Sequence, residues 1–325
     1  MKSALTFCLL LLLVLPGTRR TVQAAQVAEP SYVRLGDWAK ANGFNARWLK
    51  GEETLLLSRS GSKLVFTVDS REAEINGVQV WLLLPVVARY RALCVAQLDV
   101  DRTLRPLLTS PRAQSGAKIR TICLDPGHGG KDPGNEVGSN QEKHYTLLLA
   151  QEVRAQLAHA GLKATLTRSS DTFVELPTRP ELANHRGADL FVSLHFNAAD
   201  SGRSTVQGAE VYCLTPVGAS STNARGEGAG AGWCSGNRHN DQNLLLAYEV
   251  QKSLTRSLAV ADRGVRRARF AVLRDAVMPA VLIEAGFMSH PAEGKKIFTS
   301  AYRQKMARAI VDGLLAYKRA VEHGA

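Results

Sequence analysis

The stretch Thr121-Ile-Cys-Leu-Asp-Pro-Gly-His128 decides the fold class of this 325-residue chain. It is an almost unbroken apolar run that leads into a histidine and a Gly-rich loop. Such runs are typical of strands that are buried on both faces of a parallel sheet. Two later runs, Leu190–His195 and Ala280–Glu284, have the same form. From Lys118 onward strand and helix patterns alternate, so we predict an α/β fold whose mixed, mostly parallel sheet is flanked by helices.

Hydrophobic periodicity and turn residues give the expected elements of this part. Residues 216–240 are rich in Gly, Ser and Asn and are expected to form a long loop. The expected strands cover 119–124, 163–167, 189–195, 209–214, 270–273 and 280–284. The expected helices cover 141–160, 176–186, 242–258 and 302–318.

Residues 30–110 are predicted to form a small α+β domain of their own. A helix is expected over 32–42, ending at Gly43, and strands over 54–58, 63–68 and 78–84. Asn76-Gly77 is a strong signal for a tight hairpin. This domain contains no cluster of His, Cys and acidic residues. A polar linker, 111–118, is expected to join it to a catalytic domain at 119–322.

The first 24 residues have the pattern of a secretory signal peptide. Lys2 is followed by the aliphatic run Leu9–Leu15, and Val22-Gln23-Ala24 suits cleavage after Ala24. The run is shorter than the roughly 20 residues that a membrane span needs, so no stable span is expected after processing. Arg19 and Arg20 leave a retained anchor as the alternative. We predict export to the periplasm, the cell envelope or the outside.

The charge of the chain, formally +12, suits an anionic partner such as a cell-wall polymer. The basic residues are scattered, without a zinc finger or an RNA-binding signature, so no nucleic acid is expected. A merely solvated basic surface is the alternative. Cys94, Cys123, Cys213 and Cys234 form no Cys-x-x-Cys pair, which argues against a zinc site built from cysteines.

Ionisable residues end the three buried runs, at His128, His195 and Glu284. Ligands of open α/β sheets bind at the carboxyl ends of the strands, so these residues are expected to converge. Glu142 adds a carboxylate on the apolar side of the helix that follows the Gly-rich loop. A simple first-turn Glu is the alternative, since helix N-termini favour acids. His144 lies roughly 200° further round this helix and is expected to be exposed.

Two imidazoles and one carboxylate, from His128, His195 and Glu142, are the ligand set of a catalytic zinc with an open fourth position for water. Glu284 then remains free to serve as general base, taking a proton from water and returning it to the leaving nitrogen. Each histidine alone would more often be a core or capping residue. The loop 127–134 lacks the spacing of a phosphate-binding loop, and its glycines allow a tight turn around His128.

The motifs in this order resemble the type 3 family of N-acetylmuramoyl-L-alanine amidases, over about residues 119–318. The resemblance implies a Zn²⁺ enzyme that hydrolyses the amide between N-acetylmuramic acid and L-alanine in peptidoglycan. It implies His128, Glu142 and His195 as metal ligands and Glu284 as the catalytic residue. The matching segments are Leu124–Gly134, Glu142-Lys143, Asn184–Asn197, Asp262–Val265 and Pro279–Met288.

Two other functions stay open on the sequence. A zinc peptidase that cuts within the stem peptide would use the same four residues, and a wall-binding pseudoenzyme would lack turnover. The 216–240 segment is too irregular for the inhibitory helical insertion of some family members, and the sequence identifies no protein activator. Residues 30–110 loosely resemble the amine-oxidase N-terminal domain, and wall targeting is one possible role for them.

Overall fold

The computed structural model describes residues 30–51, 53–89, 91–109, 118–223, 228 and 232–323. The predicted signal peptide and the predicted linker, apart from Lys118, lie outside the described residues. Ser31–Ala325 make up one compact unit. Among the described residues, no helix combines the length and the hydrophobicity that a membrane crossing requires.

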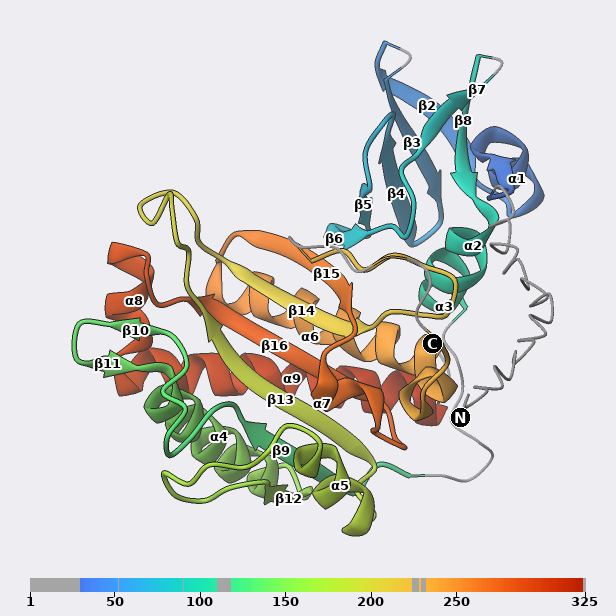
Figure 1. The fold of residues 1–325 in the computed structure, drawn as a ribbon. Helices are drawn as coiled ribbons and strands as arrows, with labels where there is room; N and C mark the ends of the chain where they lie inside the picture. The colour runs from blue at the N-terminus through green and yellow to red at the C-terminus, as the bar shows by residue number, and fades with distance from the viewer. Residues whose placement is uncertain are drawn as a thin grey trace, which may run out of the picture. The chain divides into compact units, whose positions relative to one another are not determined.

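A mixed, mostly parallel sheet forms the centre of residues 118–323, as predicted (Figure 1). Its strands follow the order β12-β9-β13-β16-β14-β15. Neighbouring strands are parallel except for β14, which is antiparallel to β16. The strand bounds are β9 Thr121–Pro126, β12 Lys163–Leu166, β13 Leu190–Asn197, β14 Ala209–Leu214, β15 Asp262–Ala268 and β16 Ala280–Phe287.

Helices cover both faces of this sheet (Figure 1). On one face, α4, α6 and α9 bury aliphatic side chains such as Val153, Val250 and Ile310 in the main core. On the other face, α5 and α7 cover a smaller cluster around Phe191. The helix bounds are α4 Glu142–His159, α5 Thr178–His185, α6 Asn240–Leu258, α7 Ala271–Arg274, α8 Pro291–Ile297 and α9 Ser300–His323.

One predicted strand is wrong. Residues 271–273 belong to the short helix α7 and Phe270 is its N-cap, and the strand at this point of the fold is β15 instead. A four-residue apolar run cannot by itself distinguish a strand from a buried helical turn. β15 escaped prediction because three of its seven residues are arginines, at positions 263, 266 and 267.

The described residues of the N-terminal part form an antiparallel meander of five strands, a separate antiparallel sheet of three strands, and short helices. The Asn76-Gly77 hairpin is confirmed, with φ of +51° and +79°, as a tight turn with two left-handed residues requires. The predicted helix starts later than expected, because Tyr32–Arg34 form a strand. The bounds are β1 Tyr32–Arg34, α1 Leu35–Ala41, β2 Asn45–Lys50, β3 Thr54–Arg59, β4 Ser62–Thr67, β5 Glu72–Ile75, β6 Val78–Trp81, β7 Val87–Arg89, β8 Ala92–Ala96, α2 Gln97–Asp99, the π-helical turn Val100–Leu104 and α3 Arg105–Leu108.

The N-terminal strands extend the central sheet. β6 pairs in parallel with β15 at Val80 and Val265, and β5, β4, β3 and β2 continue the order beyond β6. The described residues thus contribute eleven strands to one sheet. Arg267, only 2% exposed, donates to the carbonyl oxygens of Trp81 (3.0 Å) and Arg102 (2.9 Å) across this junction. The boundary between the two predicted domains therefore separates parts that share one sheet.

Candidate metal and catalytic site

The loop after β9 presents His128 in a left-handed backbone conformation, with φ of +61°. Such a conformation is costly for a residue with a Cβ and persists only where its surroundings impose it. Here the buried Arg179 donates to the carbonyl oxygens of Pro126 (3.0 Å) and His128 (2.9 Å). The buried Arg168 donates to those of Pro126 (2.9 Å) and Gly127 (2.8 Å). These two guanidinium groups fix the path of the loop.

Glu142 is the first residue of α4 and is 1% exposed. Its Oε1 accepts the backbone N–H of Phe196 (3.0 Å), and its Oε2 accepts both the backbone and side-chain N–H groups of Asn135 (2.9 Å each). Its carboxylate also contacts His128 Nε2 (3.1 Å) and His195 Nδ1 (3.0 Å). Burial opposes ionisation, but the two histidines hold the pKa of Glu142 well below its usual range. The charge predicted on the buried side of this helix is therefore present and compensated.

The donor atoms of His128, Glu142 and His195 all lie within 4.8 Å of one another. The two imidazole rings meet edge to face, with their centroids 4.9 Å apart. His128 Nδ1 lies 2.8 Å from Asp132 Oδ2, an arrangement that orients a metal-binding histidine and leaves Nε2 directed at the cluster. The donor set and its outer carboxylate fit a zinc ion.

Glycines make room for this cluster. A Cβ on Gly127 would lie 2.2 Å from Cε1 of His195. A Cβ on Gly134 would lie 2.6 Å from Cδ2 of His128 and 2.7 Å from Oε2 of Glu142, and Gly134 also has a φ of +67°. The Gly-rich loop thus serves close packing against the histidines as well as the turn itself.

Glu284 lies beside the cluster on β16, in register with His195 on β13 and with Glu210 on β14. Its Oε2 is buried and has no hydrogen-bond partner among the described residues. Burial, and then the negative charges of Glu142 and Glu210, raise the pKa of Glu284 well above its ordinary value. A buried carboxyl oxygen without a partner is rare and indicates a site that a ligand or a reaction uses.

The structure thus brings together the four residues that the sequence singles out, while His144 is exposed, as expected. Sequence reasoning missed Asp125, which is fully buried and accepts hydrogen bonds from Thr167, Arg179 and Ser193. This network ties β9 to β13 behind His128. In the sequence, the only sign of this network is one acidic residue, Asp125, inside an apolar run.

Glu210 was also missed. It is 4% exposed and accepts hydrogen bonds from Arg263 Nε (3.1 Å), Asn197 Nδ2 (2.9 Å) and the Tyr212 hydroxyl (3.0 Å). Arg266 Nε adds an ion pair at 3.0 Å. The arginines belong to β15, so this group links the candidate site to the strand on which the N-terminal part docks.

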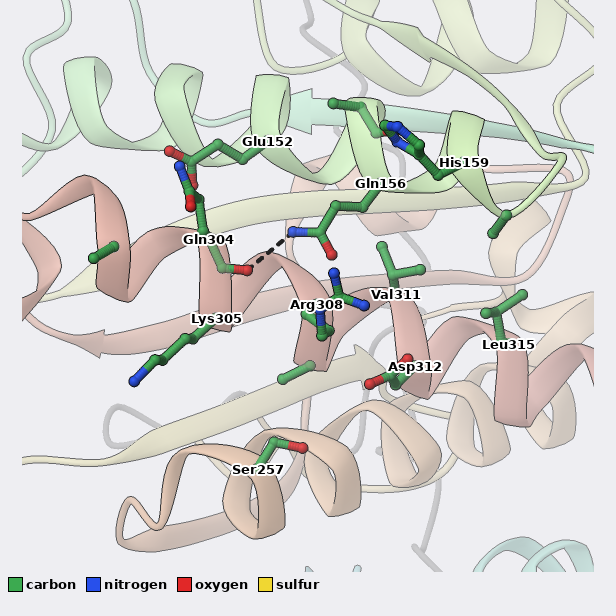
Figure 2. Close-up of a pocket in the computed structure, with 14 residues that line it drawn as sticks. Glu152, Gln156, His159, Ser257, Gln304, Lys305, Arg308, Val311, Asp312 and Leu315 are labelled. Atoms are coloured by element: carbon green, nitrogen blue, oxygen red, sulfur yellow. Dashed lines mark hydrogen bonds between the residues drawn. The ribbon is translucent and has the colours of Figure 1, made fainter.

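A separate hollow of about 1000 Å³ lies between α4 and α9 (Figure 2). Its residues include Gln156, whose side-chain amide donates to the carbonyl oxygen of Gln304 (2.9 Å), and Arg308. None of the four candidate site residues lines it. This hollow is therefore separate from the candidate catalytic site despite its volume.

Comparison with known proteins identifies the family of this chain. Residues 122–316 match the family model described as N-acetylmuramoyl-L-alanine amidase. The chain belongs to this amidase family. Its sequence is 35% identical over 233 residues to the N-acetylmuramoyl-L-alanine amidase AmiA of Escherichia coli (strain K12), covering 64% of this chain and 80% of AmiA. The predicted family is thereby confirmed.

Solved structures of other amidases share the fold. The N-acetylmuramoyl-L-alanine amidase of Clostridium difficile 630 is 33% identical, with a TM-score of 0.51, and covers 62% of this chain and 97% of its own. The amidase AmiC2 of Nostoc punctiforme is 34% identical, with the same TM-score, and covers 62% and 98%. The family match begins at residue 122, so the N-terminal strands lie outside it.

Proposed function

We propose that this amidase hydrolyses the bond between N-acetylmuramic acid and L-alanine of peptidoglycan, with Zn²⁺ held by His128, Glu142 and His195. The observation that supports this most is the meeting of these donors beside the Glu284 carboxyl oxygen that has no hydrogen-bond partner within the described part of the chain. A ligand set alone would suit a structural metal. An additional carboxylate that no other group occupies is what hydrolysis of an amide requires.

The side chains divide the work. Asp132 orients His128, and the N–H groups of Asn135 and Phe196 hold Glu142 in place as a ligand. A bound zinc supplies Lewis acidity that polarises the amide carbonyl and makes water nucleophilic near neutral pH. Glu284 accepts the proton of the attacking water at its carboxylate and delivers it to the leaving nitrogen of L-alanine. A raised pKa suits this second step, because the carboxyl must keep the proton until the bond breaks.

Removal of one imidazole tests the metal site. His195→Ala should lose bound zinc and activity together, with affinity lower by orders of magnitude, whereas His144→Ala should keep both. Zinc content is measured by elemental analysis on folded protein. A folded His195→Ala protein with stoichiometric zinc would remove His195 from the ligand set.

Product analysis separates the amidase from the peptidase alternative. Digestion of purified cell wall by zinc-loaded protein should give free muramic lactyl groups and peptides that begin at L-alanine. New termini inside the stem peptide would support a peptidase. No product at all from zinc-loaded protein would support a wall-binding pseudoenzyme.

We further propose that the protein is exported and acts in the cell envelope, with residues 1–24 as its signal. A wall substrate lies outside the membrane, which supports this assignment. N-terminal sequencing of the protein isolated from the envelope should show a start at Ala25, and a start at Met1 would indicate a retained anchor instead.

A further inference from the structure

A row of polar side chains leads from Glu284 across the sheet onto the N-terminal part. Glu284 and Glu210 pair on adjacent strands, and the next strand, β15, carries Arg263 and Arg266. Beyond them, a polar hollow of about 340 Å³ opens at the junction of β15, β6 and β5. It is lined by Glu72, Gln79, Thr205, Gln207, Ala261, Asp262, Arg263 and Arg266.

The guanidinium of Arg263 lines this hollow and is held in position by neighbouring side chains. Its Nε donates to Glu210 (3.1 Å), its Cζ lies 4.8 Å from the ring centre of Phe287, and its side chain is 30% exposed. No hydrogen bond joins its two terminal nitrogens to any of the described residues. Their N–H groups form the planar fork that recognises a carboxylate through two hydrogen bonds.

The N-terminal part holds this arginine in position. The indole N–H of Trp81 donates to the carbonyl oxygen of Arg263 (3.1 Å), and the guanidinium of Arg266 lies 4.1 Å from the Trp81 ring centre. β6 therefore fixes the backbone of Arg263 and also the side chain of Arg266, the other arginine that contacts Glu210.

A negative charge follows further along the row. Glu72 is exposed at the far side of the hollow, where its Oε2 accepts a hydrogen bond from Gln79 Nε2 (2.7 Å). The other acid of the hollow, Asp262, is already used by the backbone N–H groups of Gln79 and Gly264. At the usual spacing of adjacent strands, β15 lies roughly 10 Å and β5 roughly 19 Å from β16.

We infer that this hollow binds the stem peptide of the substrate, with Arg263 taking a carboxylate near the cleaved amide and Glu72 taking an amine further along. The inference rests on the proposed function and deepens it. A stem peptide has an acidic second residue and often a diamino acid third, so its charges follow the same order. The neutral sugars of the glycan strand offer neither charge. The N-terminal strands are therefore part of the substrate site.

Soluble muramoyl tripeptides test the subsite. The first has a free carboxylate on residue two and a free amine on residue three, the second has the carboxylate amidated, and the third has the amine acetylated. The wild-type protein should prefer the first over the second by about twofold to fivefold in kcat/KM, as for a partly exposed ion pair. Arg263→Gln should bring the ratio of the first to the second substrate close to one, and Arg263→Lys should give an intermediate ratio. Glu72→Gln should bring the ratio of the first to the third substrate close to one.

The control is Arg308→Gln, the same chemical change in the hollow between α4 and α9, and it should keep the wild-type ratios (Figure 2). A ratio that Arg263→Gln leaves unchanged would overturn the subsite. Calorimetric binding of the free tripeptides separates this outcome from failure of the proposed function. If binding depends on the carboxylate but no peptide is released from the muramoyl substrates, the subsite is retained and the amidase activity is rejected. If peptide is released equally from all three substrates, the amidase activity is retained and the subsite is rejected.

Discussion

At the scale of single residues, two carboxylates a short distance apart experience opposite surroundings. Glu142 is buried but receives hydrogen bonds from imidazoles and backbone N–H groups, and these keep its pKa low. Burial, and then the nearby carboxylates of Glu142 and Glu210, raise the pKa of Glu284, and its Oε2 has no hydrogen-bond partner among the described residues. Carboxylates whose environments separate their pKa values in this way commonly divide the roles of charge stabilisation and proton transfer.

Glu284→Gln should separate metal binding from proton transfer. The substitution keeps size and polarity but cannot accept the proton of water, so we expect normal zinc content and turnover lower by about 10²–10⁴. Glu181→Gln makes the same change on the exposed side of α5 and should have no effect. Turnover at the wild-type level in a folded, zinc-loaded Glu284→Gln protein would remove Glu284 from the mechanism. Loss of zinc would instead make it a ligand.

His128 should give the metal-free protein an unusual pH dependence. Burial lowers the pKa of its imidazole, but hydrogen bonds and charges from Glu142 and Asp132 outweigh burial and raise it. The stabilising ion pair is complete below the unfolded-state pKa of about 6.5 and is lost as the pH rises through the higher folded-state pKa. The melting temperature of chelated protein should therefore fall above about pH 6.5.

The matching control is His128→Asn, which should abolish this fall, whereas His144→Ala should leave it. Zinc-loaded protein should behave in the opposite sense, because zinc needs a neutral imidazole and binds more tightly as the pH rises. A chelated protein that becomes more stable over the same interval would contradict the assignment.

The four candidate residues could be predicted from the sequence because each interrupts an apolar pattern. His128 follows β9 and Glu142 begins α4, whereas His195 and Glu284 lie within β13 and β16, which continue beyond the predicted strand ends. Asp125 and Glu210 could not, because their partners come from other strands and helices distant in the chain. Which arginine meets which acid is a property of the sheet order, and periodicity does not encode that order.

At the scale of elements, the loop between β9 and α4 depends on glycine for two different reasons. Gly134 and Gly138 have nearly the same left-handed φ, +67° and +60°. A Cβ on Gly134 would meet His128 and Glu142, whereas a Cβ on Gly138 would meet nothing within 4 Å. The pair therefore distinguishes backbone strain from crowding of the site.

Gly134→Ala and Gly138→Ala should both lose roughly 1 kcal/mol of stability from the left-handed backbone. Only Gly134→Ala should also lose zinc affinity, because the added methyl group displaces two of the candidate ligands. Denaturant melts of chelated protein and zinc titrations measure the two effects separately. Equal zinc affinity in the two variants would show that the loop adapts without cost to the site.

β15 shows why one element was not predicted. Arg267 would be expected on a solvated surface, yet it is buried and its guanidinium is satisfied by carbonyl oxygens of Trp81 and Arg102. These acceptors lie more than 160 residues earlier in the chain. Because the groups that allow this charge to be buried are so distant in the chain, the sequence pattern of β15 reads as a polar segment although β15 is a central strand.

At the scale of the whole molecule, the shared sheet changes what a truncation is expected to do. All four candidate residues lie after residue 119, which on the sequence alone favours an active fragment 119–325. The structure adds that removing the N-terminal strands would turn β15 into an unpaired edge and would remove the Trp81 and Arg102 carbonyl oxygens that accept hydrogen bonds from Arg267.

We therefore expect fragment 119–325 to be less stable than the full chain by roughly 3 kcal/mol, about 1.5 kcal/mol for each of the two hydrogen bonds that Arg267 loses. The unpaired edge should also make it self-associate. Thermal melting and size-exclusion chromatography measure these effects. Tyr248→Phe, which removes one hydrogen bond to the carbonyl oxygen of Ile75, should cost only about 1 kcal/mol and leave the protein monomeric. A monomeric fragment as stable as the full chain would show that the two parts are independent.

The parallel pairing of β6 with β15 also sets the order of events in folding. Gln79 and Asp262, which are hydrogen-bonded across this junction, are separated by 183 residues. Contacts with such large separations pay a loop-closure entropy before they gain any stabilisation, and they slow folding. β6 can pair with β15 only after both segments have been synthesised. The hydrogen bond from the Trp81 indole to the carbonyl oxygen of Arg263 therefore depends on segments from both parts of the chain.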